Sequence, residues 1–538
     1  MQIIKGKLIN HPSALRKVLF TLIALAVWSF FLWRGLDVFK PGVNSATFFN
    51  SDCAIPVLMS NDERPITLFN LYYYGTDRWG GWPFLLAQLV RRSTGYRWSV
   101  QSLSMMQTFW LFIGALIIAG LSRKDRAVVA LVFLLTLCLH GETRYQIFEL
   151  SQVYAWQATA LLLSWYSLRR LFDNDLDSKN YRAWKRAAWL FLAFFFSYLA
   201  IWSSIASIPF LLFLLCLEVL RMRLKREGGG WLQPFITGLI PVLAAVLVEW
   251  LQKMDYHRHA DKHYGFDFSS RFELDAGYLT KNLGIHLDKI IKLSWWPLHL
   301  VATLAVLAVI CVLAYALLKK SGELLGKLKA IFTDDTAILI IGAYGIALIN
   351  FILAVIVSHV RLNYYDDRYL TLTSLFGPVS GILTLFLILN WFARRSPIRE
   401  FAKPVFLLAG IILLAVKFPS GSYWPEYRTV EETALALAQK SPRAILLGGY
   451  WETYIFAALQ PVNTMTPVPL EGQENRMPWT RDMVRLADQV VVEYRRSGLI
   501  EADQPPQHLS QYGNSLRLAE PKWYENGDFA FALYVRDD

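Results

Sequence analysis

The sequence predicts a mainly α-helical polytopic membrane protein, a bundle of about eleven transmembrane helices followed by a small C-terminal α/β domain. Three observations support this fold class. The chain of 538 residues is 55% hydrophobic and 15% aromatic. Apolar runs of about 18 residues or more recur along it, each long enough to cross a hydrocarbon layer of roughly 30 Å as a helix. After about residue 417 the composition changes to that of a soluble domain.

The apolar runs define the predicted spans, and the charged connections between them define the topology. Alternate connections carry clusters of Lys and Arg, which places these connections and the N-terminus in the cytoplasm. The net charge of +12 therefore belongs to membrane-flanking loops, and no nucleic acid partner is expected. An odd number of spans puts the C-terminus on the opposite, outer side. The predicted spans are 18–36, 103–121, 127–140, 150–168, 187–202, 205–220, 231–251, 297–318, 336–358, 369–392 and 404–417.

We therefore expect two domains in a multi-pass inner (plasma) membrane protein. Residues 1–417 form the transmembrane module, and residues 418–538 form a soluble periplasmic or extracytoplasmic α/β domain. The module carries two long outer loops, 37–102 and 252–296. Each loop contains a segment that is too short or too charged to span, and that is typical of a helix lying in the membrane interface. These segments are "WGGWPFLLAQLVRR" in the first loop and the stretch before Trp295 and Trp296 in the second.

The C-terminal domain contains two short apolar runs that predict buried strands, at 443–447 and 489–493. The stretch "LLGGYWETY" indicates a strand, a glycine turn and the start of a helix. This turn would present three side chains for substrate binding toward the membrane surface. Alternatively, the glycines only form a turn and the aromatic residues pack in a core. The three candidates are Tyr450, Trp451 and Glu452.

An acidic residue, Asp52, follows the first predicted span in the stretch "FFNSDCAIPVLMSNDERP". Its neighbours are apolar, and a carboxylate among apolar groups is partly desolvated, which suits a general base. The alternative is that Asp52 caps a short helix beginning at Cys53, because Asp is a preferred N-cap residue. The two roles are compatible.

This arrangement resembles the GT-C superfamily of membrane glycosyltransferases, which includes oligosaccharyltransferases, protein O-mannosyltransferases and the lipid A aminoarabinose transferase. The resemblance covers the cytoplasmic N-terminus, the acidic first outer loop, the many spans and the outer C-terminal domain. In that superfamily an acidic residue of the first outer loop lies at the catalytic centre, and the donor is a sugar on a polyprenyl phosphate. The matching motif here is "NSD", residues 50–52. The Trp-Trp-Asp signature of oligosaccharyltransferases is absent, which argues against peptide asparagine as acceptor.

The resemblance implies an inverting glycosyltransferase with Asp52 as general base. It would move a monosaccharide from a polyprenyl-phosphate donor to a cell-envelope glycan, lipid or protein on the outer face of the membrane. Such a reaction needs a base for the acceptor hydroxyl and cations for the leaving phosphate.

Two short outer loops, "HGETRYQIFELSQ" and "HVRLNYYDDRY", supply candidate cations for the donor phosphate. They contain Arg144, Arg361 and Arg368, and arginine suits phosphate through its planar set of donors. The alternative is internal ion pairing, of Arg144 with Glu142 or Glu149 and of Arg368 with Asp366 or Asp367. The same loops contain further candidates for substrate binding: Glu142, Tyr364, Tyr365 and Asp366.

The run "HRHADKH" in the second long loop is the one metal-like pattern in the sequence. Its weak candidates are His257, His259, Asp261 and His263. Their spacing does not match one face of a helix, so a hydrated loop is the competing interpretation. Some members of the superfamily use a divalent ion, so Mg²⁺ or Mn²⁺ shared by Asp52 with Glu142 or Asp62 stays open.

Two other functions are compatible with this composition. A transporter or flippase of lipid-linked glycans would need ionisable groups near the bilayer midplane and often shows repeated halves, and the sequence has neither feature. A non-catalytic membrane scaffold with an outer binding domain is excluded less firmly.

Overall fold

The computed structural model describes most of the chain after residue 50. The described ranges are 51–74, 79–122, 124–174, 183–225, 231–259, 272–292, 295–319, 322–393, 399–417, 427–461, 464–477, 479–496 and 504–537. The predicted span 18–36 and two of the metal candidates, Asp261 and His263, lie outside these ranges.

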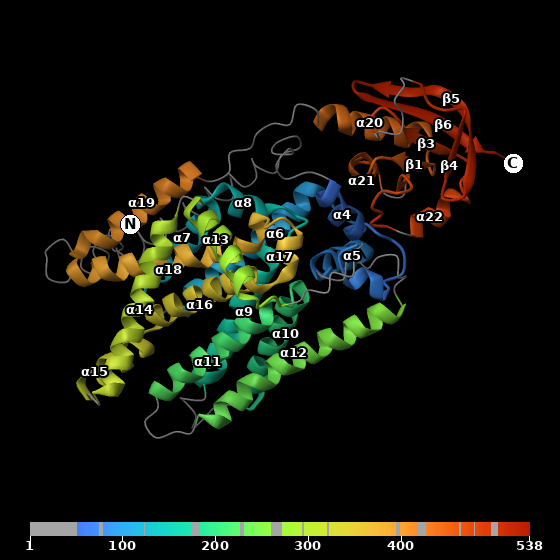
Figure 1. The fold of residues 1–538 in the computed structure, drawn as a ribbon. Coiled ribbons are helices and arrows are strands. Elements are labelled where there is room, and N and C mark those ends of the chain that lie inside the picture. The colour runs from blue at the N-terminus through green and yellow to red at the C-terminus, as the bar shows by residue number, and fades with distance from the viewer. Residues whose placement is uncertain are drawn as a thin grey trace, which may run out of the picture.

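Within the described residues, a helix lies at each of the ten other predicted spans (Figure 1). Six of these helices (α6, α10, α12, α14, α16 and α18) are long and apolar enough to cross a membrane. A seventh crossing results if α7 and the short helix α8 (Gly141–Phe148), which meet at 101°, count as one broken span. The ten helices are α6 (Val100–Leu121), α7 (Arg126–Leu139), α9 (Tyr154–Asn174), α10 (Ala183–Ser203), α11 (Ser207–Lys225), α12 (Leu232–His259), α14 (Trp296–Leu318), α16 (Asp335–Ile356), α18 (Thr371–Ala393) and α19 (Arg399–Lys417).

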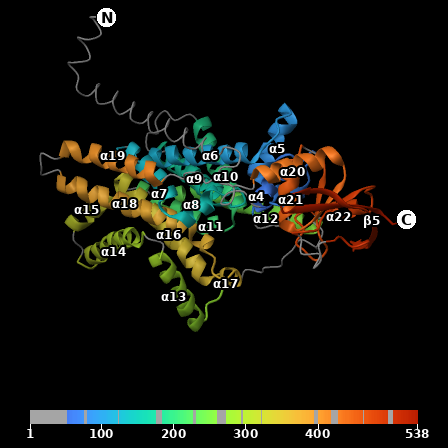
Figure 2. The ribbon, with the colours of Figure 1, turned by 90° about the horizontal axis from the view of Figure 1, so that it is seen from above.

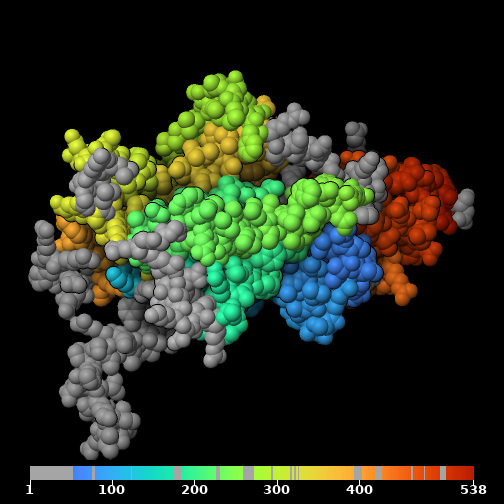
Figure 3. Space-filling model, turned by 90° about the horizontal axis from the view of Figure 1, so that it is seen from below, coloured from blue at the N-terminus to red at the C-terminus, as the bar shows by residue number. Residues whose placement is uncertain are grey.

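The bundle core forms around α9, which has helix neighbours on several sides. Its Trp165 is fully buried, and Gly342 of α16 leaves the space that the indole ring occupies, since a Cβ at residue 342 would collide with that ring. In Figure 3, α12 runs along the surface of the bundle as a long ridge past α5 (Trp82–Thr94). The predicted all-helical membrane module is therefore confirmed.

A buried ionic cluster joins α9 and α11 at one end of the bundle. Glu218 accepts hydrogen bonds from Trp165 at 2.6 Å and from Arg169 at 2.8 Å, and it pairs with Arg221 at 2.9 Å. Arg221 also pairs with Asp173 at 2.6 Å. Burying charges is costly unless each one is paired, and here each guanidinium has a carboxylate partner.

The connections between the spans contain several short helices. These include η1 (Leu68–Leu71), α13 (Ala276–Lys292), α15 (Gly322–Thr333), α17 (Ser358–Leu362) and η3 (Asp367–Leu370). Helices α5 and α13 lie where the sequence predicts interfacial helices. On α13, Leu283, Leu287 and Ile291 repeat every four residues and are exposed together. Figure 2 shows α13 projecting to one side of the bundle next to α17.

The C-terminal domain is α/β, as predicted, with a six-stranded sheet of order β2-β1-β3-β6-β5-β4. The two predicted strands are confirmed as β1 and β3. Strand β1 pairs in parallel with both β2 and β3, and β6, β5 and β4 continue the sheet from β3 with antiparallel pairing. The elements are α20 (Tyr427–Lys440), β1 (Ile445–Gly448), α21 (Tyr450–Leu459), β2 (Thr466–Pro469), α22 (Trp479–Val484), β3 (Val490–Glu493), β4 (His508–Gln511), β5 (Asn514–Asn526) and β6 (Phe529–Arg536).

The C-terminal domain packs against the first outer loop. Helix α4 (Ser51–Ser60) lies beside α21 in Figure 1, and their apolar faces share one buried cluster. Within that cluster Cys53 and Ile55 of α4 join Tyr454 and Ala458 of α21. The guanidinium of Arg64 lies 3.4 Å from the ring centroid of Trp479 and adds a second contact. This docking brings residues of the two domains together at one site.

Candidate functional site

Asp52 is a helical residue of α4, which the structure describes from Ser51 to Ser60, so it is not the cap of a helix that begins at Cys53. The next three residues, Cys53 to Ile55, are fully buried, whereas Asp52 itself is partly exposed. Its carboxylate thus lies at the edge of an apolar surface and stays accessible.

The Asp52 carboxylate is hydrogen-bonded across the domain interface. The Tyr450 hydroxyl donates to Asp52 Oδ1 at 2.6 Å, a contact between residues 398 positions apart. Arg476 Nε donates in turn to the Tyr450 hydroxyl at 3.3 Å. The Tyr73 hydroxyl donates to the backbone carbonyl oxygen of Asp52 at 2.6 Å. The side chain and the backbone of Asp52 are therefore both fixed by tyrosines.

Burial keeps these two tyrosines protonated. It raises the pKa of the Tyr450 hydroxyl, the negative charge of Asp52 raises it further, and Arg476 opposes the shift. Burial also raises the pKa of Tyr73 well above its usual value, with Asp52 adding to the effect. Both phenols are neutral at physiological pH, so they act as hydrogen-bond donors to Asp52.

The loop before α22 holds Tyr450 in place. Gln473 Oε1 accepts from the backbone N–H of Tyr450 at 2.6 Å. This satisfies one of the first N–H groups of α21, which have no partner inside the helix. Arg476 is oriented by Glu474, whose Oε1 is 3.2 Å from Arg476 Nη1. Sequence reasoning missed Gln473, Glu474 and Arg476, because the loop "EGQENRMPW" carries no periodic or motif signal.

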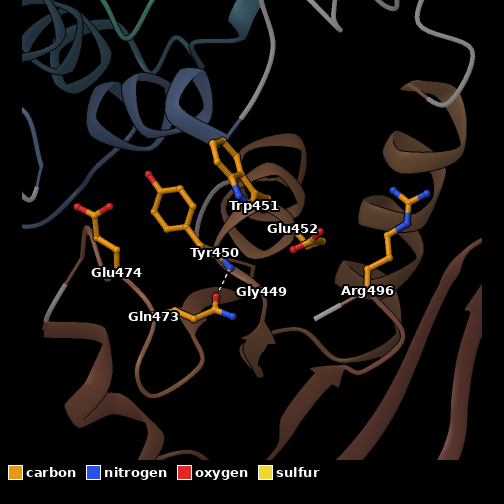
Figure 4. Close-up of a pocket in the computed structure, with 7 residues that line it drawn as sticks. All are labelled: Gly449, Tyr450, Trp451, Glu452, Gln473, Glu474 and Arg496. Carbon is orange, nitrogen blue, oxygen red and sulfur yellow. Dashed lines mark hydrogen bonds between the residues drawn. The ribbon is translucent and has the colours of Figure 1, made fainter. Parts of the chain in front are cut away.

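A pocket of about 420 Å³ opens beside Tyr450 in the C-terminal domain (Figure 4). The three residues proposed for substrate binding, Tyr450, Trp451 and Glu452, all line it. Trp451 is 54% exposed, so it does not pack in the core as the alternative expects, whereas Tyr454 one turn later does. Burial raises the pKa of Glu452, and a hydrogen bond from its own backbone N–H and the charge of Arg496 oppose the shift.

Two of the predicted phosphate-binding arginines lie on elements that pack together. Arg144 is on α8 and Arg368 is on η3, and α8 contacts η3. In each of these arginines Nε is buried without a hydrogen-bond partner among the described residues. Arg144 forms no ion pair within that part of the chain, and Arg368 Nε is 3.7 Å from Asp366 Oδ2. Both guanidinium groups therefore keep donor capacity.

The two acidic candidates next to these arginines have local partners. Glu142 Oε1 accepts from Gln146 Nε2 at 2.7 Å. Asp366 caps η3, since its Oδ1 accepts from the backbone N–H of Arg368 at 2.9 Å. These contacts orient the segments that carry Arg144 and Arg368.

The third arginine, Arg361, contributes to a different contact. It pairs with Glu273 at 2.8 Å, a partner that the sequence did not indicate, and its guanidinium lies 4.6 Å from the ring centroid of Tyr278. The Tyr365 hydroxyl donates to Asn282 of α13 at 2.8 Å, and the neighbouring Tyr364 is 93% exposed. Arg361 and Tyr365 therefore hold α13 and the residues just before it against α17 and the turn that follows it.

Helix α8 and the residue after it have contacts toward both parts of the candidate site. Just after its C-terminal end, Glu149 Oε1 lies 3.9 Å from Sγ of Cys53, the residue that follows Asp52. Helix α8 also contacts η3, which carries Arg368. Arg144 and Arg368 therefore lie on elements that touch, and the residue after α8 reaches the neighbour of Asp52.

The metal candidates do not converge on Asp52 within the described residues. Asp62 is ten residues beyond Asp52 and past the opposite end of α4, roughly 15 Å away at 1.5 Å per residue, too far to share one ion. Asp62 instead pairs with Arg64 at 2.5 Å. His257 is exposed on α12, and no group of three or more potential metal ligands occurs in the part of the chain that the structure describes.

Comparison with known proteins shows similarity only at the level of structure. No family model matches the sequence, and no curated protein matches it. The chain is similar to ArnT from Cupriavidus metallidurans in the apo state, with 11% identity, coverage of 97% of this chain and 98% of that chain, and a TM-score of 0.49.

Two similar structures are archaeal. The first is the oligosaccharyltransferase AglB from Archaeoglobus fulgidus in complex with an inhibitory peptide and a dolichol-phosphate, with 13% identity, coverage of 87% of this chain and 69% of that chain, and a TM-score of 0.35. The second is an oligosaccharyltransferase from Archaeoglobus fulgidus in the apo form, with 11% identity, coverage of 82% and 64%, and a TM-score of 0.38. Identities this low transfer no residue role.

Proposed function

We propose that this protein is an inverting membrane glycosyltransferase that moves a monosaccharide from a polyprenyl-phosphate donor to a hydroxyl group of a cell-envelope glycan, lipid or protein. The observation that carries the proposal is the Asp52 carboxylate, partly exposed and bonded by Tyr450 at 2.6 Å next to a pocket of the C-terminal domain. Catalytic side chains need this kind of fixed orientation, because small displacements from the reactive geometry are costly in rate.

Asp52 is the general base of the proposed reaction. Tyr450 occupies Oδ1, so Oδ2 is the atom that takes the proton from the acceptor hydroxyl as that oxygen attacks the anomeric carbon. Attack opposite to the leaving phosphate inverts the anomeric configuration. The polyprenyl phosphate leaves as an anion and needs no proton, so a single carboxylate is sufficient.

Arg144 and Arg368 bind the phosphate of the donor. A buried N–H group without a partner costs roughly 1–3 kcal/mol, and a phosphate oxygen removes that cost with a charge-assisted hydrogen bond. Within the described part of the chain, Nε of both arginines is buried without a hydrogen-bond partner, and Arg368 Nε is in addition 3.7 Å from Asp366 Oδ2. Arg144 lies within α8 and Arg368 within η3, two short connecting helices that contact each other. In the proposed complex these helices hold the donor phosphate, its lipid tail lies beside the spans and its sugar faces Asp52.

The test is sugar transfer by the purified full-length protein in lipid nanodiscs. The donors are polyprenyl phosphates that carry glucose, galactose, mannose or N-acetylglucosamine, and the acceptor is a total envelope extract. We expect Asp52→Asn to lower kcat by roughly 10²–10⁴-fold, the usual contribution of a general base. Arg144→Gln should raise the KM of the donor by about tenfold or more, because it removes hydrogen bonds to a charged group.

The matched control is Asp288→Asn, which removes an exposed carboxylate on α13 whose partner is Lys292. This variant should transfer like the wild type. Full turnover by Asp52→Asn would refute the role of Asp52. Absence of transfer by the wild type from every donor would refute the enzyme class and favour a transporter or a scaffold.

A further inference from the structure

We infer that the pocket of the C-terminal domain binds a saccharide ring, the sugar residue of the acceptor that receives the transferred monosaccharide. This inference rests on the proposed function and names its acceptor class. It is argued from the chemistry of the lining and from the position of the pocket relative to Asp52.

The pocket offers one aromatic face. Trp451 is 54% exposed, whereas Tyr454 on the same helix is fully buried. The Tyr450 ring meets the Trp451 ring edge-on, with centroids 5.2 Å apart, and so fixes its orientation. Figure 4 shows the indole on the pocket wall next to Tyr450. A flat, rigid aromatic ring whose edge is open to water can stack against the C–H face of a pyranose ring.

The polar groups around Trp451 suit hydroxyl groups. Glu452 and Glu474 supply acceptors, and Gln473 and Arg496 supply donors. Figure 4 shows Glu452 and Arg496 on one side of Tyr450 and Glu474 on the other. Two of the polar side chains are held by ion pairs with residues outside the pocket lining: Arg496 pairs with Asp528 at 2.8 Å, and Glu474 lies 3.2 Å from Arg476. A sugar hydroxyl both donates and accepts, so it matches such a mixed set.

Charge and size narrow the class of ligand. Two carboxylates against one arginine disfavour a phosphate or a carboxylate ligand, because like charges repel at short range. A purely apolar lipid chain would exclude water from these charged side chains without offering them hydrogen bonds. The volume of about 420 Å³ is within the range of pockets that hold small molecules. An uncharged hexose or N-acetylhexosamine residue fits all three constraints.

The position of the pocket connects it to the proposed reaction. Tyr450 forms part of the pocket wall while its hydroxyl bonds Asp52 Oδ1 at 2.6 Å. A sugar stacked beside Tyr450 therefore has hydroxyl groups on the side of the pocket where Asp52 lies. The C-terminal domain would thus present the acceptor, and the membrane module would present the lipid-borne donor.

The test measures binding separately from transfer. Saturation-transfer-difference NMR on the full-length protein in nanodiscs uses three probes: methyl α-glucopyranoside, methyl α-mannopyranoside and methyl N-acetyl-β-glucosaminide. We expect signal transfer to at least one of them. Trp451→Ala should weaken its Kd by about threefold to tenfold, the contribution expected from an aromatic contact. Trp231→Ala is the matched control, since Trp231 is also 54% exposed but lies before α12, outside the pocket.

A second variant, Glu452→Gln, keeps the volume of the side chain and guards against misfolding of Trp451→Ala. It should weaken binding while the melting temperature stays at or above that of the wild type. The inference is overturned if no probe gives a signal with the wild type, or if binding survives both Trp451→Ala and Glu452→Gln.

The two proposals fail in different ways. Asp52→Asn should bind the probe with the Kd of the wild type and yet fail to transfer sugar. Transfer that depends on Asp52 without any saccharide binding in the pocket would refute the acceptor site alone. Saccharide binding that depends on Trp451 in a protein without transferase activity would refute the proposed function alone.

Discussion

Replacing Tyr450 by Phe tests whether the C-terminal domain positions Asp52 for the reaction. The variant loses one oxygen atom, which is 2.6 Å from Asp52 Oδ1 and 3.3 Å from Arg476 Nε. The ring keeps its place, because it packs edge-on against Tyr454 with centroids 5.4 Å apart. The change therefore removes the orientation of the carboxylate and leaves the surrounding packing intact.

The expected magnitude follows from the strength of hydrogen bonds to charged groups, about 1.5–3 kcal/mol. Asp52 is partly exposed, so water replaces part of what the phenol supplied, and the lower end of that range applies. About 1.5 kcal/mol corresponds to roughly a tenfold change in rate. We expect kcat to fall about tenfold while the KM of the donor stays unchanged, because Arg144 and Arg368 are not affected.

The assay is steady-state sugar transfer by the full-length protein, together with its melting temperature. The matched control is Tyr454→Phe, on the same helix. It loses a hydroxyl that donates to Asn475 Oδ1 at 3.0 Å and accepts from the backbone N–H of Arg476 at 2.7 Å, and that does not contact Asp52 or the Arg476 guanidinium. This control should lower the melting temperature without lowering kcat. The reasoning is refuted if Tyr450→Phe keeps the kcat of the wild type, or if both variants lose kcat equally.

Two further predictions concern stability. Glu218→Gln should destabilise the bundle by about 3–5 kcal/mol, because it leaves the buried Arg169 without its carboxylate. Glu323→Gln breaks an exposed pair with Lys327 and should leave the melting temperature in detergent close to that of the wild type, so similar melting temperatures for the two variants would contradict this prediction. Burial raises the pKa of Glu452 above 4.5, so the folded domain binds this proton more tightly than the unfolded chain does, and stability is lost as the pH rises through the folded pKa. Glu452→Gln should therefore melt at a higher temperature than the wild type near pH 7 and at a similar temperature near pH 4. If the difference in melting temperature between the variant and the wild type is the same at both pH values, the Glu452 charge does not destabilise the fold as predicted.

Apolar run length predicted the positions of the ten described helices of the bundle, although only six of them, or seven with the bent pair of α7 and α8, are long and apolar enough to span. It was a poorer guide to helix length, because α11 continues to Lys225 and buries Glu218 and Arg221 as an ion pair. A charged residue in a sequence usually indicates the end of an apolar helix. Glu218 is instead buried inside the bundle, because Arg169 of the neighbouring helix α9 pairs with its carboxylate.

In the C-terminal domain, the continuous apolar runs of β1 and β3 were recognisable, whereas β2 was not. Its sequence Thr466–Pro469 contains two prolines, which usually argue against a strand, and here it pairs with β1 at one edge of the sheet. The hairpin of β5 and β6 carries register shifts near Glu520, which interrupt the alternation of apolar residues that would reveal it.

At the candidate site, the sequence indicated Asp52 and Tyr450 separately but not their contact. Nothing local to either residue encodes a bond across 398 positions, since it depends on how α21 packs against α4. Arg476 was missed for the same reason. Among the arginines, the sequence favoured Arg361 over Arg144 as a phosphate ligand, and the pairing of Arg361 with Glu273, which no local pattern indicates, reverses that preference.

The hydrogen bond from Tyr450 to Asp52 also has a consequence for the order of biogenesis. The carboxylate is synthesised near the start of the chain, whereas its tyrosine partner emerges only after the last helix of the bundle, α19. A bundle whose C-terminal domain is not yet synthesised therefore contains the carboxylate without the phenol that orients it. In the proposed reaction such an intermediate would transfer sugar about tenfold more slowly than the complete protein, as expected for Tyr450→Phe.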